Sequence, residues 1–111
     1  MKPSIVVYKK LVRDKIPEII EQNGGKANTR ILPDWEILDA LRAKLYEEVF
    51  EFLCAKTAEE MIDELADIYE VLRTIERRHP TLKTEAENRR WTKELTNGGF
   101  ERCIFLESVE Q

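Results

Sequence analysis

Two pairs of carboxylates, each with its members three residues apart, lie in segments whose patterns are typical of helices. The first pair is Glu48 and Glu51, and the second is Glu64 and Asp67. Residues three apart share one face of a helix, so each segment would present two carboxylates side by side. Two such pairs on packed neighbouring helices would form an oxygen-rich site, the kind that Mg²⁺ and Mn²⁺ prefer.

The negative charge of the chain is concentrated around these pairs. Nine acidic residues and one lysine lie between Glu47 and Glu70, whereas the whole chain has a net charge of −4. The remainder of the chain is therefore basic on balance. An acidic run on a helix is most often a solvated face with basic partners nearby, which is the alternative to a metal site. That alternative is favoured for Glu59, Glu60, Asp63 and Glu70.

The first pair belongs to a long helix predicted from Asp34 to about Ala55. Apolar residues recur along it at helical spacing. They are Leu38, Leu41, Leu45, Phe52 and Ala55. The position that would complete this stripe between Leu45 and Phe52 is Glu48. An acidic residue in an apolar seam is costly unless it is paired or bound to a metal, which argues against a merely solvated face.

The second pair belongs to a helix that restarts after a tight turn. Thr57-Ala58-Glu59-Glu60 has the pattern of a capping box, and the helix is expected to stop near His79-Pro80. Its predicted apolar stripe consists of Met61, Leu65, Ile68, Leu72 and Ile75. A short turn makes two long helices an antiparallel pair. Glu51 and Glu64 then lie at comparable distances from the turn, so the two carboxylate pairs can face each other.

The remaining segments complete a mainly α fold. A short helix is expected from Asp14, its predicted N-cap, to Gly24-Gly25, and a polar helix over residues 84–95. Residues 5–8 and 100–109 have the alternation of strands, and we expect them to pair. The prediction is an antiparallel helix bundle with a minimal two-stranded β ribbon from the two termini. Residues 1–111 would form a single domain.

Composition limits the classes of protein. The chain has 111 residues, of which 42% are hydrophobic and 36% charged, as expected for a helix-rich globular domain. No apolar run is long enough to span a membrane, and the first residues lack the apolar stretch of a signal peptide. Cys54 and Cys103 are expected to be free thiols. The protein is expected to be cytoplasmic. The net acidity disfavours nucleic acid as a partner.

The acidic motif resembles that of a known superfamily. Two segments separated by twelve residues resemble the metal motif of the MazG-like all-α NTP pyrophosphatases. They are Glu47-Glu48-x-x-Glu51 and Glu64-x-x-Asp67. The run Lys10-Leu11-Val12-Arg13-Asp14-Lys15-Ile16-Pro17 and the later Gly98-Gly99-Phe100 are similar to the small single-domain branch, often described as phosphoribosyl-ATP pyrophosphohydrolase-like. The resemblance covers nearly the whole chain.

The resemblance implies Mg²⁺-dependent hydrolysis of a nucleoside triphosphate between its α and β phosphates, with Mn²⁺ as a substitute. The matched metal ligands are Glu48, Glu51, Glu64 and Asp67. Glu47 matches a further motif glutamate and, with Glu48, is the candidate for a catalytic role. A triphosphate is negatively charged and would be repelled by the carboxylates. Bound Mg²⁺ is therefore needed to make the charge of the site positive toward it.

Basic side chains would neutralise the leaving pyrophosphate. Arg13 and Lys15 in the N-terminal motif and Lys44, one turn before Glu47, are the candidate substrate-binding residues. The resemblance also implies a homodimer or a dimer of dimers, because two helices of so short a chain cannot bury both of their faces. The base is unassigned, and house-cleaning of non-standard nucleotides, hydrolysis of ordinary NTPs and phosphoribosyl-ATP hydrolysis all stay open.

Two alternatives compete with a pyrophosphohydrolase. A carboxylate-bridged di-iron bundle needs Glu-x-x-His pairs, and the single histidine, His79, lies outside both motifs. The other alternative is a non-catalytic helical interaction or regulatory module that uses its acidic face.

Overall fold

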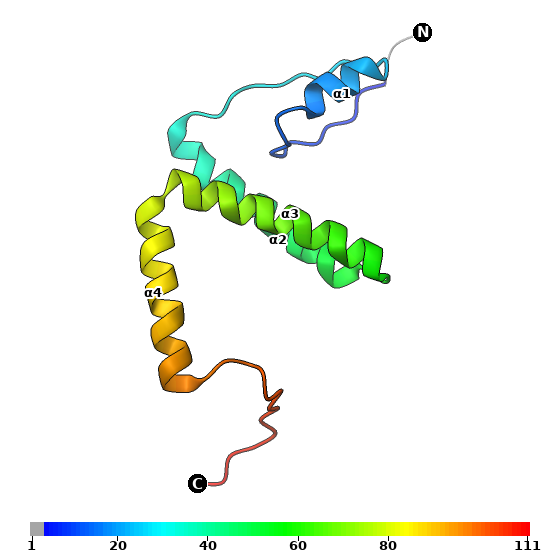
Figure 1. Ribbon diagram of the computed structural model, residues 1–111. Coiled ribbons are helices and arrows are strands. Elements are labelled where there is room, and N and C mark those ends of the chain that lie inside the picture. Colours follow the sequence, from blue (N-terminus) through cyan, green and yellow to red (C-terminus); the bar gives the residue numbers. More distant parts are fainter. Residues whose placement is uncertain (1–3) are drawn as a thin grey trace. The chain divides into compact units, whose positions relative to one another are not determined.

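The computed structural model describes residues 4–111, and in that range it contains four helices and no strand (Figure 1). They are α1 (Ile16–Gln22), α2 (Asp34–Cys54), α3 (Ala58–Arg78) and α4 (Pro80–Asn97). The chain divides into two compact units, residues 1–75 and residues 76–111. The mainly α prediction is confirmed.

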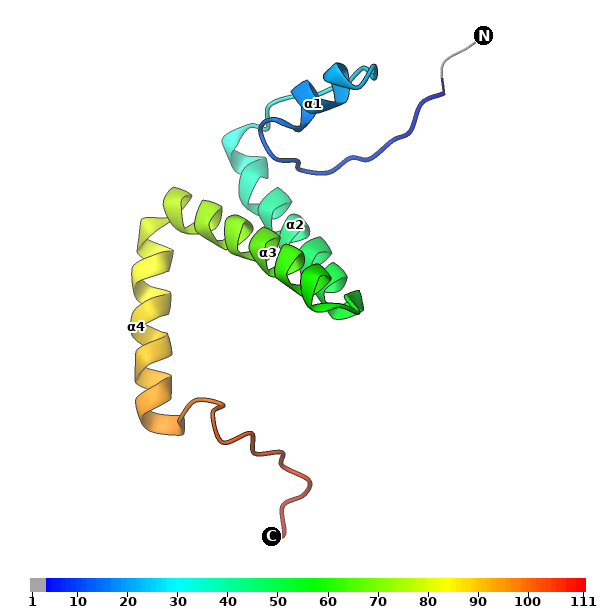
Figure 2. The same cartoon turned by 45° about the vertical axis from the view of Figure 1, so that its right-hand side comes forward.

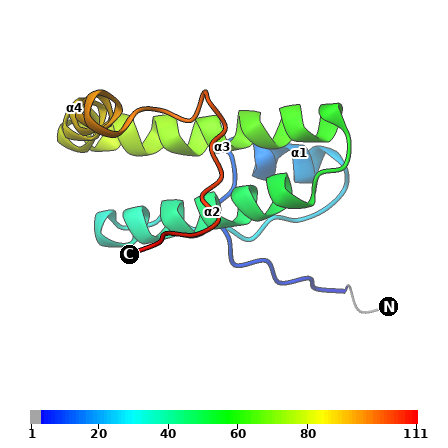
Figure 3. The same ribbon diagram turned by 90° about the horizontal axis from the view of Figure 1, so that it is seen from below.

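In the first unit, α2 and α3 run side by side and antiparallel, joined by a short turn (Figures 1, 2 and 3). The turn is closed by the predicted capping residues. Thr57 Oγ1 accepts a hydrogen bond from Glu60 N at 3.1 Å, and Glu60 Oε2 accepts one from Lys56 N at 2.8 Å. The glutamate thus reaches one residue further back than the usual capping box. The bond from Glu60 N satisfies a backbone donor that the helix start leaves free, and the bond from Lys56 N ties the turn to the helix.

The contact between α2 and α3 buries few side chains. Within the described residues, Leu41, Val71 and Glu48 are the buried ones. On α2 the predicted stripe faces inward, and Glu48 is its only charged member. On α3 the buried residue is Val71, whereas Leu72 of the predicted stripe is exposed. The inward face of α3 therefore differs from the prediction at Val71 and Leu72, because packing against α2 selects which of them is buried. The half-buried members of the predicted stripe are Leu65, Ile68 and Ile75.

The segment before α2 differs from the prediction at its cap. The short helix α1 begins at Ile16 with Lys15 at the N-cap position, and no side chain caps it. Asp14 as its cap was therefore wrong. Pro17 lies in the first turn, where its missing N–H costs nothing. Gly24 ends the helix with φ of +90°, a conformation that a residue with a Cβ rarely adopts.

The second unit contains α4, which is longer than the predicted residues 84–95. Pro80 starts it, because a proline is tolerated at the first helical position, and Gly98, with φ of +82°, ends it. On its surface Arg90 bridges Glu87 at 2.8 Å and Glu94 at 3.0 Å, which are pairs of the i,i+3 and i,i+4 kind.

The predicted β ribbon was wrong for the described residues. Residues 100–103 form a turn in which Cys103 N donates to Phe100 O at 3.0 Å, and Cys103 has φ of 52°. A left-handed residue breaks an extended run, and a two-stranded ribbon without further support is marginal in water. Cys54 and Cys103 are free, as predicted, and both are exposed. No helix among the described residues has the length and apolar character to cross a membrane.

Candidate metal centre

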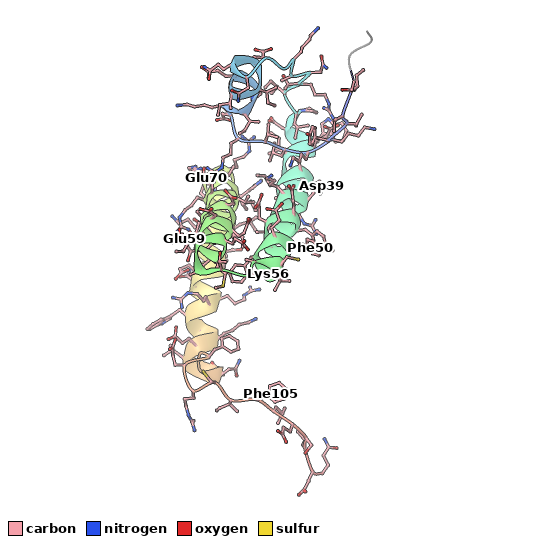
Figure 4. All side chains as sticks on the ribbon, turned by 90° about the vertical axis from the view of Figure 1, so that its right-hand side faces the viewer. Asp39, Phe50, Lys56, Glu59, Glu70 and Phe105 are labelled. Carbon is pink, nitrogen blue, oxygen red and sulfur yellow. The ribbon has the colours of Figure 1, made fainter. Side chains whose placement is uncertain are left out.

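Three of the predicted metal ligands come together where α2 packs against α3. Glu48 and Glu51 on α2 and Glu64 on α3 each offer a carboxylate oxygen, and these oxygens lie within 4.8 Å of one another. Figure 4 shows acidic side chains reaching between the two helices. The helical spacing of Glu48 and Glu51 and the antiparallel pairing of the helices together produce this carboxylate cluster of three residues.

The carboxylate cluster contains oxygens without partners. The Glu48 side chain is only 6% exposed, and its Oε1 lies 3.1 Å from Lys44 Nζ. The Oε2 atoms of Glu48 and Glu64 are buried and have no hydrogen-bond partner among the described residues. A buried polar atom without a partner is costly, so these oxygens call for a cation or a proton. Hard, closely spaced carboxylate oxygens fit Mg²⁺ or Mn²⁺.

The crowding of carboxylates changes the proton affinity of Glu64. Burial is the main cause of its raised pKa. Hydrogen bonding with Glu51 and Glu48 and the negative charges of these two residues raise the pKa further, to about 7. One proton is thus held inside the carboxylate cluster below about pH 7. A divalent cation would compete with this proton for the same oxygens.

The raised pKa of Glu64 predicts a pH-dependent stability in the presence of a chelator. The folded chain keeps the proton up to about pH 7, whereas the unfolded chain loses it near the usual 4.5. Since the folded state binds more protons between these values, the contribution of Glu64 to the free energy of unfolding falls as pH rises through this window. We expect the melting temperature of wild type to match that of Glu64→Gln near pH 5 and to fall below it near pH 8. A difference that does not change with pH would contradict this assignment.

Lys44 and Glu47 flank the carboxylate cluster on α2. Lys44 Nζ lies 3.5 Å from Glu47 Oε1 as well as 3.1 Å from Glu48 Oε1. Burial lowers the pKa of Lys44, but the hydrogen bond to Glu48 and the charges of Glu47 and Glu48 outweigh it, so the net shift is upward. Lys44 therefore remains a cation. Lys10 Nζ also reaches Glu47 Oε1, at 3.3 Å.

Asp67, the fourth predicted ligand, lies outside the carboxylate cluster. Arg13 Nη2 donates a hydrogen bond to Asp67 Oδ1 at 2.7 Å. That bond is the main cause of a raised Arg13 pKa, to which the charges of Asp67, Glu70 and Glu48 also contribute. Arg13 thus lies beside an acidic residue of the predicted metal motif.

The two other basic residues of the N-terminal motif, Lys10 and Lys15, differ from the prediction in which of them contacts the acidic residues. Among residues 4–111, Lys15 makes no ion pair with the acidic residues and lies at the N-cap position of α1. Lys10 does make such a pair and was missed as a site residue. The signal for it was available, since Lys10 opens the same motif and lies three residues before Arg13.

Comparison with known proteins gives limited information. No family model and no solved structure matches the chain. An uncharacterised protein of Mycolicibacterium smegmatis is 45% identical over 53 residues, which is 48% of this chain and 54% of that protein. The chain thus spans about half the length of this curated relative.

Proposed function

We propose that this chain is a Mg²⁺-dependent nucleoside triphosphate pyrophosphohydrolase, which cleaves between the α and β phosphates and releases the monophosphate and pyrophosphate. The observation that carries the proposal is the buried Glu48, whose Oε2 has no partner although Glu51 and Glu64 face it. The basic Lys10, Arg13 and Lys44 at the edge of the same site support a polyanionic substrate.

The residues have separate parts in this proposal. Glu48, Glu51 and Glu64 would hold Mg²⁺, with Asp67 as the fourth predicted ligand. Bound Mg²⁺ supplies charge neutralisation at the phosphates and lowers the pKa of a water. Glu47, held by Lys10 and Lys44, would orient the attacking water.

The leaving pyrophosphate carries the largest developing charge of the reaction. Arg13 and Lys44 would stabilise it, because both remain cationic beside the acidic residues. Lys15 stays a predicted phosphate contact. We place the reaction in the cytoplasm, with a nucleotide rather than a nucleic acid as the partner.

A second copy of the chain is part of the proposal. Tyr46, Val49, Phe50 and Leu53 recur at i, i+3, i+4 and i+7 on α2, and all four are exposed. By helical spacing this outer stripe lies opposite Leu41 and Glu48, and Figure 4 shows Phe50 on the side of α2 away from α3. An apolar face of this pattern suits helix packing. Because the described part of one copy buries so few apolar side chains, we propose a homodimer or a dimer of dimers.

The proposed activity predicts that pyrophosphate is released from at least one nucleotide in a panel of NTPs and dNTPs, with Mg²⁺ but not with a chelator. Asp67→Asn is expected to lower this turnover about 10- to 100-fold, the range found when groups around a metal site are removed. Asp63→Asn, the same change on the exposed surface of α3, is the control and should leave turnover unchanged.

Two results would contradict the proposal in different ways. No turnover with Mg²⁺ or Mn²⁺, together with no rise in melting temperature on adding either metal, would overturn the enzyme and favour the non-catalytic interaction module. Turnover that Asp67→Asn leaves unchanged would remove Asp67 from the metal ligands while leaving the activity in place.

A further inference from the structure

The N-terminal segment contacts both helices of the site through basic side chains only three residues apart. Lys10 donates to Glu47 on α2 at 3.3 Å, and Arg13 donates to Asp67 on α3 at 2.7 Å. Leu11 and Val12 between them are half-buried, so this short stretch is partly shielded from solvent. Ile16 N donates to Arg13 O at 3.0 Å, which ties the segment to the start of α1.

These two ion pairs lie at the solvent boundary of the site. The side chains of Arg13 and Asp67 are 54% and 37% exposed, and those of Lys10 and Glu47 are 40% and 30% exposed. Ion pairs with this exposure contribute little to stability, about 0.2–1 kcal/mol each, so they can be exchanged for other partners. The pair of Lys44 and Glu48 is different, because its side chains are only 17% and 6% exposed and are therefore less open to exchange with an incoming ligand.

The acidic side chains of the site thus fall into two groups, those with a buried oxygen that lacks a partner and those paired with a basic residue at the solvent boundary. Glu48 and Glu64 each have a buried Oε2 that no described residue satisfies, whereas Asp67 and Glu47 already have basic partners. The negative charges of Asp67 and Glu48 both act on the Arg13 guanidinium, so Arg13 and a divalent cation at the carboxylate cluster would be attracted by some of the same carboxylates. Two cations close together repel, so metal entry disfavours Arg13 in its present position.

We propose that Arg13 and Lys10 are exchangeable counter-ions, which neutralise Asp67 and Glu47 without metal and transfer to the phosphates of a metal-bound triphosphate. This rests on the proposed function, because the transfer needs a polyanion at the site. The N-terminal segment then couples the two binding events. Metal alone must compete with Arg13, whereas metal with triphosphate gives Arg13 a new anionic partner.

The exchange predicts effects of opposite sign for one substitution. Arg13→Gln should tighten binding of Mn²⁺ alone about 2- to 5-fold, the equivalent of losing one exposed competing ion pair. The same variant should weaken binding of a triphosphate in saturating Mn²⁺ by about 10-fold or more, the scale of a lost hydrogen bond to a charged group. Lys10→Ala should likewise tighten binding of Mn²⁺ alone and weaken binding of the triphosphate.

The test uses isothermal titration of the full chain, first with Mn²⁺ alone and then with an α,β-methylene nucleoside triphosphate in saturating Mn²⁺. The base is that of the nucleotide turned over fastest by wild type. Arg13→Lys retains the charge and should restore the Mn²⁺ affinity of wild type. Lys26→Ala, which removes one positive charge from an exposed position, is the control for net charge and should change neither affinity.

The outcomes separate this inference from the proposed function. If wild type binds Mn²⁺ and the analogue, but Arg13→Gln weakens both or changes neither, the exchange is overturned and the enzyme proposal stands. If wild type binds neither Mn²⁺ nor the analogue, both fall. Opposite signs for Arg13→Gln, absent in Lys26→Ala, support the exchange, because a purely structural ion pair would not tighten metal binding when removed.

Discussion

Glu48→Gln is expected to abolish metal-dependent turnover while leaving the metal-free fold as stable as wild type, or more stable. Glutamine keeps the shape of the side chain but removes the charge that a divalent cation would bind. The rate should fall at least about 100-fold, the upper end of the effects seen for groups that only support a metal ligand. Without metal, the variant loses a carboxylate that faces Glu51 and Glu64, so repulsion falls, and Lys44 keeps Glu47 as a partner.

The measurement is the melting temperature with and without Mg²⁺, beside the rate of pyrophosphate release. A ligand at 100 times its Kd stabilises a folded protein by about 2.7 kcal/mol. Wild type should show a rise of this kind, and Glu48→Gln should show none. Glu59→Gln, the same change on the exposed first turn of α3, should behave like wild type. A Glu48→Gln chain that keeps its rate and its metal-induced stabilisation would show that the site lies elsewhere.

Leu53→Glu is the second change expected to have a large effect, and Phe50→Glu should act alike. Leu53 is 74% exposed in the single chain, where a surface substitution would alter stability by about 0.5 kcal/mol or less. If the outer stripe of α2 is an interface between copies, a charge placed in it should cost about 2 kcal/mol or more and dissociate the assembly. Light scattering should then report a dimer or tetramer for wild type and a smaller species for the variant.

The melting temperature gives an independent reading of the same interface. For an assembly it rises with protein concentration, and for Leu53→Glu this dependence should disappear together with a fall in the melting temperature itself. Gln22→Glu on α1 adds the same charge at an exposed position and should leave assembly and melting unchanged. A wild-type monomer at micromolar concentration would contradict the proposed assembly, and the outer stripe would then need another explanation.

The helix pair and its buried glutamate were predictable because local signals agree. The apolar spacing on α2, the Thr57 cap and the short turn all specify one antiparallel pair, and Glu48 falls within the stripe whatever its partner. The exact face of α3 was not predictable in the same way. Val71 and Leu72 are adjacent apolar residues, and only the packing against α2 decides which one is buried.

The errors at the ends of the chain have a different physical origin. Residues 5–8 and 100–109 have strand-like composition, but strand formation depends on a paired partner more than on intrinsic preference. The turn at Phe100–Cys103 and the left-handed Cys103 cannot be recognised from residue types alone. The pairing of Arg13 with Asp67 was also beyond the sequence, since 54 positions separate the two residues.

The short turn between α2 and α3 has a consequence for how the chain folds. Glu51 and Glu64 are close in sequence, and the turn that joins their helices is held by Thr57 and Glu60. Contacts between residues near in sequence form early, because little loop entropy opposes them. We therefore expect the carboxylate cluster to assemble with this helical hairpin, before more distant segments such as Arg13 pack against it. If the proposed cation binds the hairpin, it would then also act as a template for folding.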